Sequence, residues 1–189
     1  YEAATVTDQE RIIGAIGRIA GDVDQPSREW VPAVQALIEL LHLVRNPRER
    51  VRVIRGFAHC YDRAFAVPPL LGELDESDAE VVEAALWSIG RIGVHFGGSA
   101  IANWLDGCDL DALPEAVLNR ALLALAEIGS PEAQARAESC WERGQITPKI
   151  AHLVMAESVS NRMVEHARTH LEDPATASAA ALHLAMVAH

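Results

Sequence analysis

A stripe of basic side chains is the most distinctive polar pattern in this sequence. It consists of Arg48, Arg52, Arg55 and His59. Their spacing of three or four residues places them on one face of a helix. Several guanidinium groups on one face could bind a phosphate or a carboxylate in a bidentate manner. The alternative is a structural belt of ion pairs between these arginines and the acidic helices next to them, including the segment 73–80.

A second candidate site is the pair Trp87 and Arg91, four residues apart on the helix that we expect over about 78–95. The pair faces away from the apolar stripe that contains Ile89 and Ile92. Tryptophan and arginine dominate the energetics of protein interfaces, so an exposed pair indicates a protein-binding surface. The alternative is a packing seam against the preceding helices.

The metal-ligand candidates are His166 and His170, at positions i and i+4 of a helix expected over 161–172. This spacing can chelate a metal ion. Glu165 precedes both histidines, however, so the H-E-x-x-H pattern is absent. The alternative is that the histidines simply flank the core face of their helix. We predict no metal centre and no cofactor.

The remaining chemistry-bearing residues favour a protein without catalytic activity. Cys60, Cys108 and Cys140 are widely spaced, odd in number and form no C-x-x-C pair, which is typical of a reducing compartment. We expect them to be buried as small apolar residues. The sequence contains no glycine-rich phosphate loop and no G-x-S-x-G, and we identify no convincing carboxylate pair.

Composition restricts the class of partner. The formal charge of −11 disfavours an extended nucleic-acid interface and a basic surface for anionic membranes. No apolar run is long enough to span a membrane, and no signal peptide opens the chain, so we expect a cytoplasmic protein. The single lysine, Lys149, against fifteen arginines is typical of a GC-rich bacterial genome.

Helical periodicity, without strand-like alternation, predicts an all-α protein. Gly97 and Gly98 are expected to end the helix over 78–95, and Ser77 with Glu80 is expected to form its capping box. The other helices are expected over about 8–20, from Ser27 to about Val44, 47–63, a short stretch from Pro68, about 101–105, two helices that end at Gly129 and Gly144, a helix from Pro148, 161–172 and 175–189.

Two segments, 81–93 and 117–129, repeat at an offset of 36 residues, and each consists of an apolar helix that ends in Ile-Gly. A period in this range is typical of stacked helix pairs. These segments resemble the bacterial HEAT-like repeats of the phycobilin lyase type. The resemblance implies one α-solenoid domain over 1–189, an ARM/HEAT superhelix of about five antiparallel helix pairs, clearest in repeats 78–107 and 114–144.

The repeats favour a non-enzymatic scaffold module that binds a protein or peptide in a groove. The enzymatic alternative is a HEAT-like lyase or DNA glycosylase with a cleft near the helices over 47–63 and 78–95. Trp87, Trp104 and Asp106 could serve such a glycosylase, although the net charge opposes this function. No His-Glu dipeptide occurs, which argues against the HEAT-like di-iron hydroxylases.

The last helix, 175–189, is apolar nearly all round. A terminal repeat needs a polar outer face to remain soluble. We therefore expect this helix to be covered by a protein partner, by the remainder of a larger chain, or by a second copy in a homo-oligomer. The alternative is that it turns back and is fully buried.

Overall fold

The computed structural model describes residues 6–21, 27–60, 64–155 and 161–187. Within these ranges the chain is helical and contains no β-strand, which confirms the all-α prediction. The α-helices are α1 (Val6–Gly21), α2 (Ser27–Leu43), α3 (Pro47–Phe57), α4 (Val67–Leu71), α5 (Ala79–Ile92), α6 (His95–Gly107), α7 (Glu115–Ile128), α8 (Glu132–Glu142), α9 (Pro148–Val154), α10 (Asn161–Thr169) and α11 (Ala177–Val187), and the 3₁₀ turns are η1 (Ala64–Ala66), η2 (Gly72–Asp75) and η3 (His170–Glu172).

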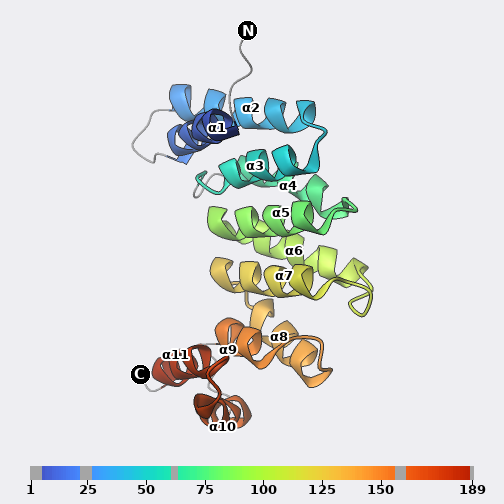
Figure 1. Ribbon diagram of the computed structural model, residues 1–189, viewed down its shortest axis with the longest axis vertical. Coiled ribbons are helices and arrows are strands. Elements are labelled where there is room, and N and C mark those ends of the chain that lie inside the picture. Colours follow the sequence, from blue (N-terminus) through green and yellow to red (C-terminus); the bar gives the residue numbers. More distant parts are fainter. Residues whose placement is uncertain (1–5, 22–26, 61–63, 156–160, 188–189) are drawn as a thin grey trace.

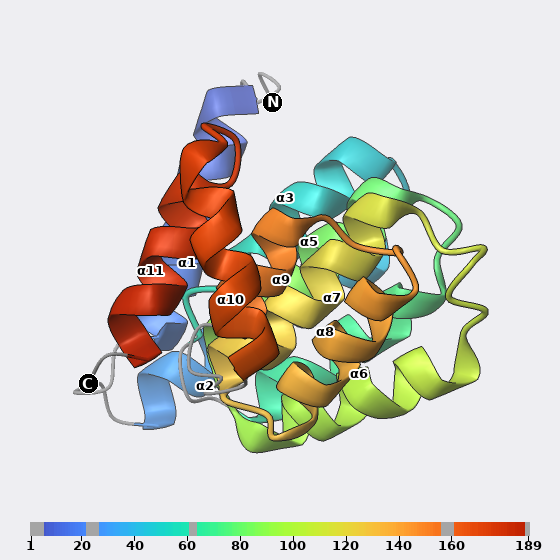
Figure 2. The same cartoon turned by 90° about the horizontal axis from the view of Figure 1, so that it is seen from below.

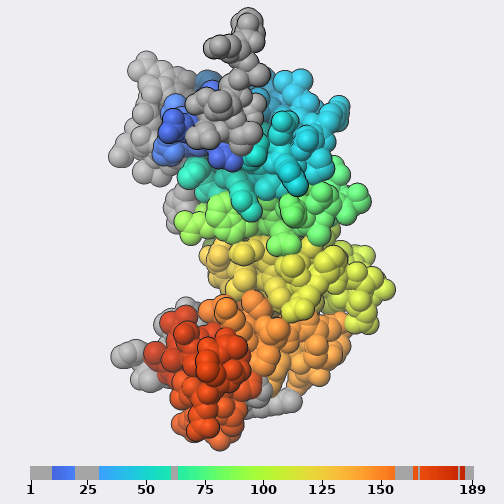
Figure 3. Space-filling model, in the orientation of Figure 1, coloured from blue at the N-terminus to red at the C-terminus, as the bar shows by residue number. Residues whose placement is uncertain are grey.

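The helices are stacked along the long axis of an elongated molecule (Figure 1). One row contains α1, α3, α5, α7 and α9, each packed against the next. Beside it, α2 packs on α1 and α3, α4 on α5, α6 on α5 and α7, and α8 on α7 and α9. The space-filling view shows consecutive segments as successive bands (Figure 3). Viewed from below, α10 and α11 project on one side of the row (Figure 2).

The two predicted repeat helices have matching boundaries. Both α5 and α7 are 14 residues long, and the first residue of α7 lies 36 positions after that of α5. Each helix ends at a glycine in the left-handed conformation, Gly93 with φ 76° and Gly129 with φ 73°. Glycine adopts this conformation without the steric penalty of a Cβ atom. The predicted Ile-Gly helix ends are thus confirmed at both positions.

Small residues bring α5 and α7 into close contact. A Cβ atom built on Gly90 would lie 3.0 Å from Cα of Ala124 and 2.7 Å from a carboxylate oxygen of Glu127. Ala85 and Ala121, which are also on these helices, are fully buried. Larger side chains at these positions would separate the helices, so the spacing of the row depends on their small size.

A buried hydroxyl connects α5 to α3. Ser88 is fully buried, and its Oγ donates a hydrogen bond of 2.9 Å to the carbonyl oxygen of Ile54. Ile54 lies in the last turn of α3, where helical carbonyl groups lack an intrahelical donor. The serine therefore satisfies a buried backbone acceptor and also fixes the position of α5 against α3.

The helix over 47–63 was predicted too long, because α3 ends at Phe57. The amides of Ala58, His59 and Cys60 bond to carbonyls only three residues earlier, at 3.2, 3.3 and 2.8 Å. Such tightening ends an α-helix. Ala58, which follows α3 directly, is half-buried, and residues 61–63 of the predicted helix lie outside the described residues.

Two expectations around α5 were also wrong. Helix α5 ends at Ile92, while Gly97 and Gly98 lie buried inside α6. They are tolerated there because α6 packs closely: a Cβ on Gly97 would lie 2.7 Å from the side chain of Ile89. At the N-terminus of α5 the cap is Asp78, whose carboxylate accepts a 2.9 Å hydrogen bond from the amide of Glu80, and Ser77 is not the cap.

The C-terminal helix is covered on one face only. Helix α11 packs against α9 and α10 and buries Ala179 and Ala180, while the side chain of Leu182 is 47% exposed. The alternative in which this helix is fully buried is therefore wrong for its described residues. Among the described helices, none combines the length and hydrophobicity required to cross a membrane.

We predict that Gly90→Ala lowers the free energy of unfolding by about 1–2 kcal/mol, because overpacking at Ala124 outweighs the gain in helix propensity. The matched control is Gly107→Ala, since Gly107 is also helical and a Cβ atom built on it would meet nothing within 4 Å. This control should unfold at the wild-type temperature or slightly above it. Thermal unfolding followed by circular dichroism measures both variants, and equal midpoints would contradict the proposed contact.

Candidate binding groove

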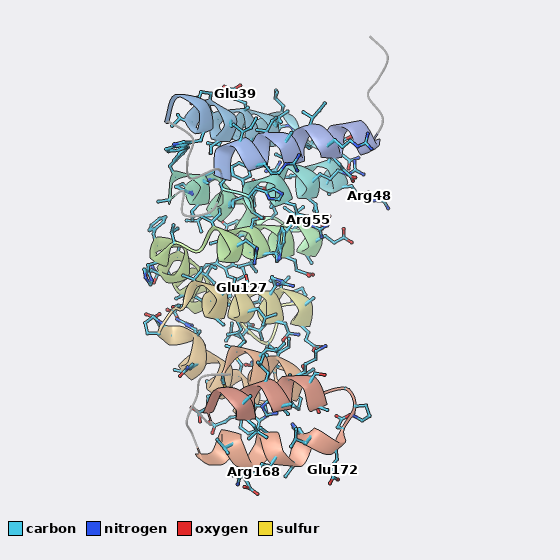
Figure 4. The ribbon with its side chains drawn as sticks, turned by 90° about the vertical axis from the view of Figure 1, so that its left-hand side faces the viewer. Glu39, Arg48, Arg55, Glu127, Arg168 and Glu172 are labelled. Carbon is cyan, nitrogen blue, oxygen red and sulfur yellow. The ribbon has the colours of Figure 1, made fainter. Side chains whose placement is uncertain are left out.

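A groove crosses the flank of α3, α5 and α7, and Figure 4 labels one of its residues, Arg55. It contains a cavity of about 310 Å³. The lining residues are Arg55 from α3, Glu83, Ala84 and Trp87 from α5, and Arg120 from α7. Three successive helices thus contribute side chains to one site, although 65 positions of sequence separate the first from the last.

Helical spacing explains why these side chains converge. Glu83 and Trp87 lie four residues apart and therefore share one face of α5. The neighbouring residues Leu86 and Ile89 are fully buried and hold that helix to the core. Arg55 of α3 and Arg120 of α7 line the same cavity as Ala84, which is buried in α5.

The two arginines of the groove have no ionic partner within the described part of the chain. Among its side chains, no carboxylate oxygen lies within ion-pair distance, 4.0 Å, of Arg55 or Arg120. The pattern is different for Arg52, whose Nε lies 3.1 Å from Oε1 of Glu10. The groove therefore presents two guanidinium groups that are available to an external anion.

The structure divides the predicted arginine stripe. Arg52, Arg55 and His59 line a second cavity of about 230 Å³ together with Glu10 of α1, whereas Arg48 is an exposed residue in the first turn of α3 and does not line that cavity. Arg55 lines both cavities. Of the predicted stripe, only Arg52, Arg55 and His59 thus form one continuous site.

Within the stripe, Arg52 forms an ion pair with a neighbouring helix through Glu10 of α1, whereas the arginine that pairs with the acidic segment 73–80 lies outside the stripe. Arg50 Nε and Nη2 donate to the two carboxylate oxygens of Glu73 at 2.5 and 2.7 Å. Arg50 Nη2 also lies 3.3 Å from Glu76. Glu73 is buried, so this bidentate pair connects α3 to η2 inside the protein. The hydrogen bond to Glu73 is the main cause that raises the pKa of Arg50.

Sequence reasoning missed Arg50 because it does not share the spacing of the basic stripe. The available signal was the acidic run itself, in which a glutamate flanked by Gly72 and Leu74 precedes the exposed acids. Its burial follows from the 3₁₀ geometry of η2, which turns Glu73 and Leu74 inward. Local periodicity does not reveal such a turn.

Trp87 and Arg91 share the flank of α5 but not the cavity. Trp87 is half-buried and lines the groove, while Arg91 is exposed and is not among the lining residues. Arg55 of the preceding helix α3 lines the same cavity, so Trp87 lies beside the preceding helices and also at an open site. Glu127, which Figure 4 labels on α7, lies on the same flank.

The metal-ligand prediction falls partly outside the described residues, because the side chain of His166 is not described. His170 lies beside another histidine: its Nδ1 is 3.1 Å from Nε2 of His152, which is buried in α9. In the part of the chain that the structure describes, no three His, Cys, Asp or Glu side chains gather in a group that could hold a metal ion.

The residues suggested for a glycosylase site lie apart. Trp104 and Asp106 belong to α6, and Asp106 accepts a 2.8 Å hydrogen bond from Arg136 of α8. The cavity that Trp87 lines contains neither of them. Asp106 thus connects α6 to α8 and does not join Trp87 in one site.

The burial of the cysteines favours a structural role for them. Cys60 and Cys140 are buried. Cys108 is half-buried, and its thiol lies 3.2 Å from the carbonyl oxygen of Trp104. Burial raises the pKa of the Cys108 thiol, and the charge of Asp75 raises it further. A raised pKa disfavours the thiolate that a nucleophile requires.

Comparison with known proteins identifies no relative: no protein-family model matches the chain, and no curated protein matches it significantly. The resemblance to HEAT-like repeats therefore stays a prediction.

We predict that Glu73→Gln lowers the free energy of unfolding by about 2–3 kcal/mol, since it leaves the charge of Arg50 partly buried beside a neutral amide. Glu76→Gln is the control, because the side chain of Glu76 is 43% exposed and its loss should cost less than about 1 kcal/mol. Urea unfolding measures both values. An equal effect of the two substitutions would show that the buried pair is not the stabilising one.

We also predict that Cys108 reacts slowly with a disulfide reagent at about pH 8, and that its rate still rises above about pH 9, because the raised pKa delays thiolate formation. Cys60 and Cys140 should react only as the protein unfolds, since both are buried. Stopped-flow absorbance with single-cysteine variants assigns each rate. Complete reaction in concentrated guanidinium is the control, and rapid native reaction of Cys60 would contradict its burial.

Proposed function

We propose that this protein is a non-enzymatic interaction module, a HEAT-like α-solenoid that binds a segment of a protein partner along the flank of α3, α5 and α7. The observation that carries the proposal is the groove in which Trp87 lies with the guanidinium groups of Arg55 and Arg120, neither of which meets a carboxylate among the described side chains. Tryptophan and arginine are the residues that most often supply the binding energy of protein interfaces.

The solenoid part of the proposal is supported by the repeated geometry. Helices α5 and α7 share their length and their left-handed glycine ends at an offset of 36 residues. A row of successive helices with a second row beside it is the arrangement that such repeats produce. We extend this arrangement to the complete described chain as one domain.

The shape of the site favours an extended ligand. The cavity that contains Arg52 and His59 adjoins the cavity that contains Trp87, and Arg55 lines both. Neighbouring helices pack about 10 Å apart, and an extended chain advances about 3.3 Å per residue. A peptide of roughly nine residues would therefore cross from α1 to α7 and contact every helix of the row between them.

The test begins with selection of random peptides of about 12 residues, long enough for this crossing, on the immobilised wild-type protein by display. We predict that the selected peptides lose at least about tenfold in affinity for Trp87→Ala, because this substitution removes the apolar wall of the groove. Trp104→Ala is the matched control, since Trp104 is also half-buried but lies on α6. Calorimetric titration gives the affinities, and thermal unfolding verifies that both variants fold.

Equal affinity for wild type and Trp87→Ala would place the binding surface elsewhere and would overturn the proposal. Loss of affinity for Trp104→Ala alone would assign binding to the side of α6 and α8. Failure of the selection to yield any binding peptide would also count against a peptide-binding groove.

A further inference from the structure

We infer that the groove between α3, α5 and α7 recognises the carboxylate of a single, isolated aspartate or glutamate side chain in a segment of its protein partner. The inference rests on the proposed function, because it assigns the chemistry of the same groove. Its basis is the convergence of Arg55 and Arg120 on one cavity without a carboxylate within ion-pair distance among the described side chains.

The contacts of the arginines distinguish those with a structural role from the two that line the groove. Arg50, Arg52 and Arg136 each meet a carboxylate of the protein itself, at 2.5, 3.1 and 2.8 Å. In a chain with a formal charge of −11, carboxylates are in excess. Two guanidinium groups that share one cavity, and that meet none of these carboxylates in the described ranges, form a site of locally positive charge.

The charge of the cavity matches a monoanion. Arg55 and Arg120 carry one positive charge each and Glu83 carries one negative charge, which leaves a net charge of +1 at the lining. One carboxylate neutralises it. A phosphate group carries about −1.5 to −2 charges near neutral pH, so it would meet repulsion from Glu83 after the first charge is balanced.

The cavity also suits the remainder of an acidic side chain. Trp87 and Ala84 offer apolar surface to its methylene groups, while the guanidinium groups provide planar pairs of N–H donors for the two carboxylate oxygens. Arg120 is half-buried, which reduces its hydration and strengthens a charge-assisted hydrogen bond. Glu83 disfavours a second carboxylate in the same cavity and thereby selects an isolated acidic residue.

The experiment repeats the same display selection on three proteins: wild type, the double variant Arg55→Gln/Arg120→Gln, and the control Arg143→Gln. Arg143 is an exposed arginine at the C-terminal end of α8, outside the groove. We expect aspartate or glutamate at one enriched position on wild type and on Arg143→Gln, and no such enrichment on the double variant. Thermal unfolding confirms that all three are folded.

The selected peptides then provide the quantitative test. Replacement of the enriched acid by its amide should reduce affinity for wild type at least about tenfold and leave the affinity for the double variant unchanged, since the interaction is already lost there. Replacement by phosphoserine should also weaken binding to wild type. Tighter binding of the phosphopeptide, by about tenfold or more, would overturn the assignment to a carboxylate.

The outcomes distinguish this inference from the function on which it rests. Selection of peptides without an acidic residue, which still depend on Trp87, would overturn the carboxylate assignment and leave the peptide-binding groove standing. Acidic peptides that bind wild type and the Arg55→Gln/Arg120→Gln variant with equal affinity would also overturn the carboxylate assignment alone. Peptides that depend on neither Trp87 nor the arginines would overturn both.

Discussion

The close contact of α5 with α7 is the constraint on which the rest of the structure depends. Gly90 and Ala124 meet where any larger side chain would force the helices apart. Because both helices also pack against members of the second row, a wider spacing would be transmitted to α6 and its buried glycines. The same close spacing allows side chains of α3, α5 and α7 to reach a common cavity, so the packing and the proposed binding surface have one physical origin.

Hydrogen bonds and ion pairs, which are directional, fix the orientation of the packed helices relative to one another. Apolar burial alone does not fix how one helix is rotated against its neighbour. The hydrogen bond from Ser88 to the carbonyl of Ile54, in contrast, requires one register between α5 and α3. The bidentate pair of Arg50 with Glu73 does the same between α3 and η2. Both contacts satisfy groups that would otherwise be costly to bury. Together they hold Arg55 at the edge of α3 that faces Trp87.

Two sets of arginines therefore have different consequences. Arg50, Arg52 and Arg136 meet the protein's own carboxylates and connect separate elements, as Arg136 does between α8 and α6. Arg55 and Arg120 instead lie at an open groove beside Trp87, which is why we assign recognition to them. The acidic excess of the remaining surface repels other anions, and screening over about 8–10 Å confines the attraction to the groove itself.

The amino-acid sequence by itself determined the helical class, most helix positions and the glycine ends of α5 and α7, because periodicity and backbone sterics are local properties. It also identified Arg55 and Trp87 as candidates, since both face away from apolar stripes. Only the tertiary structure decided that Arg120 joins them and that Arg50 is the arginine that pairs with the acidic segment. Both facts depend on contacts between helices that are distant in sequence, and such contacts leave no periodic signal in either helix alone.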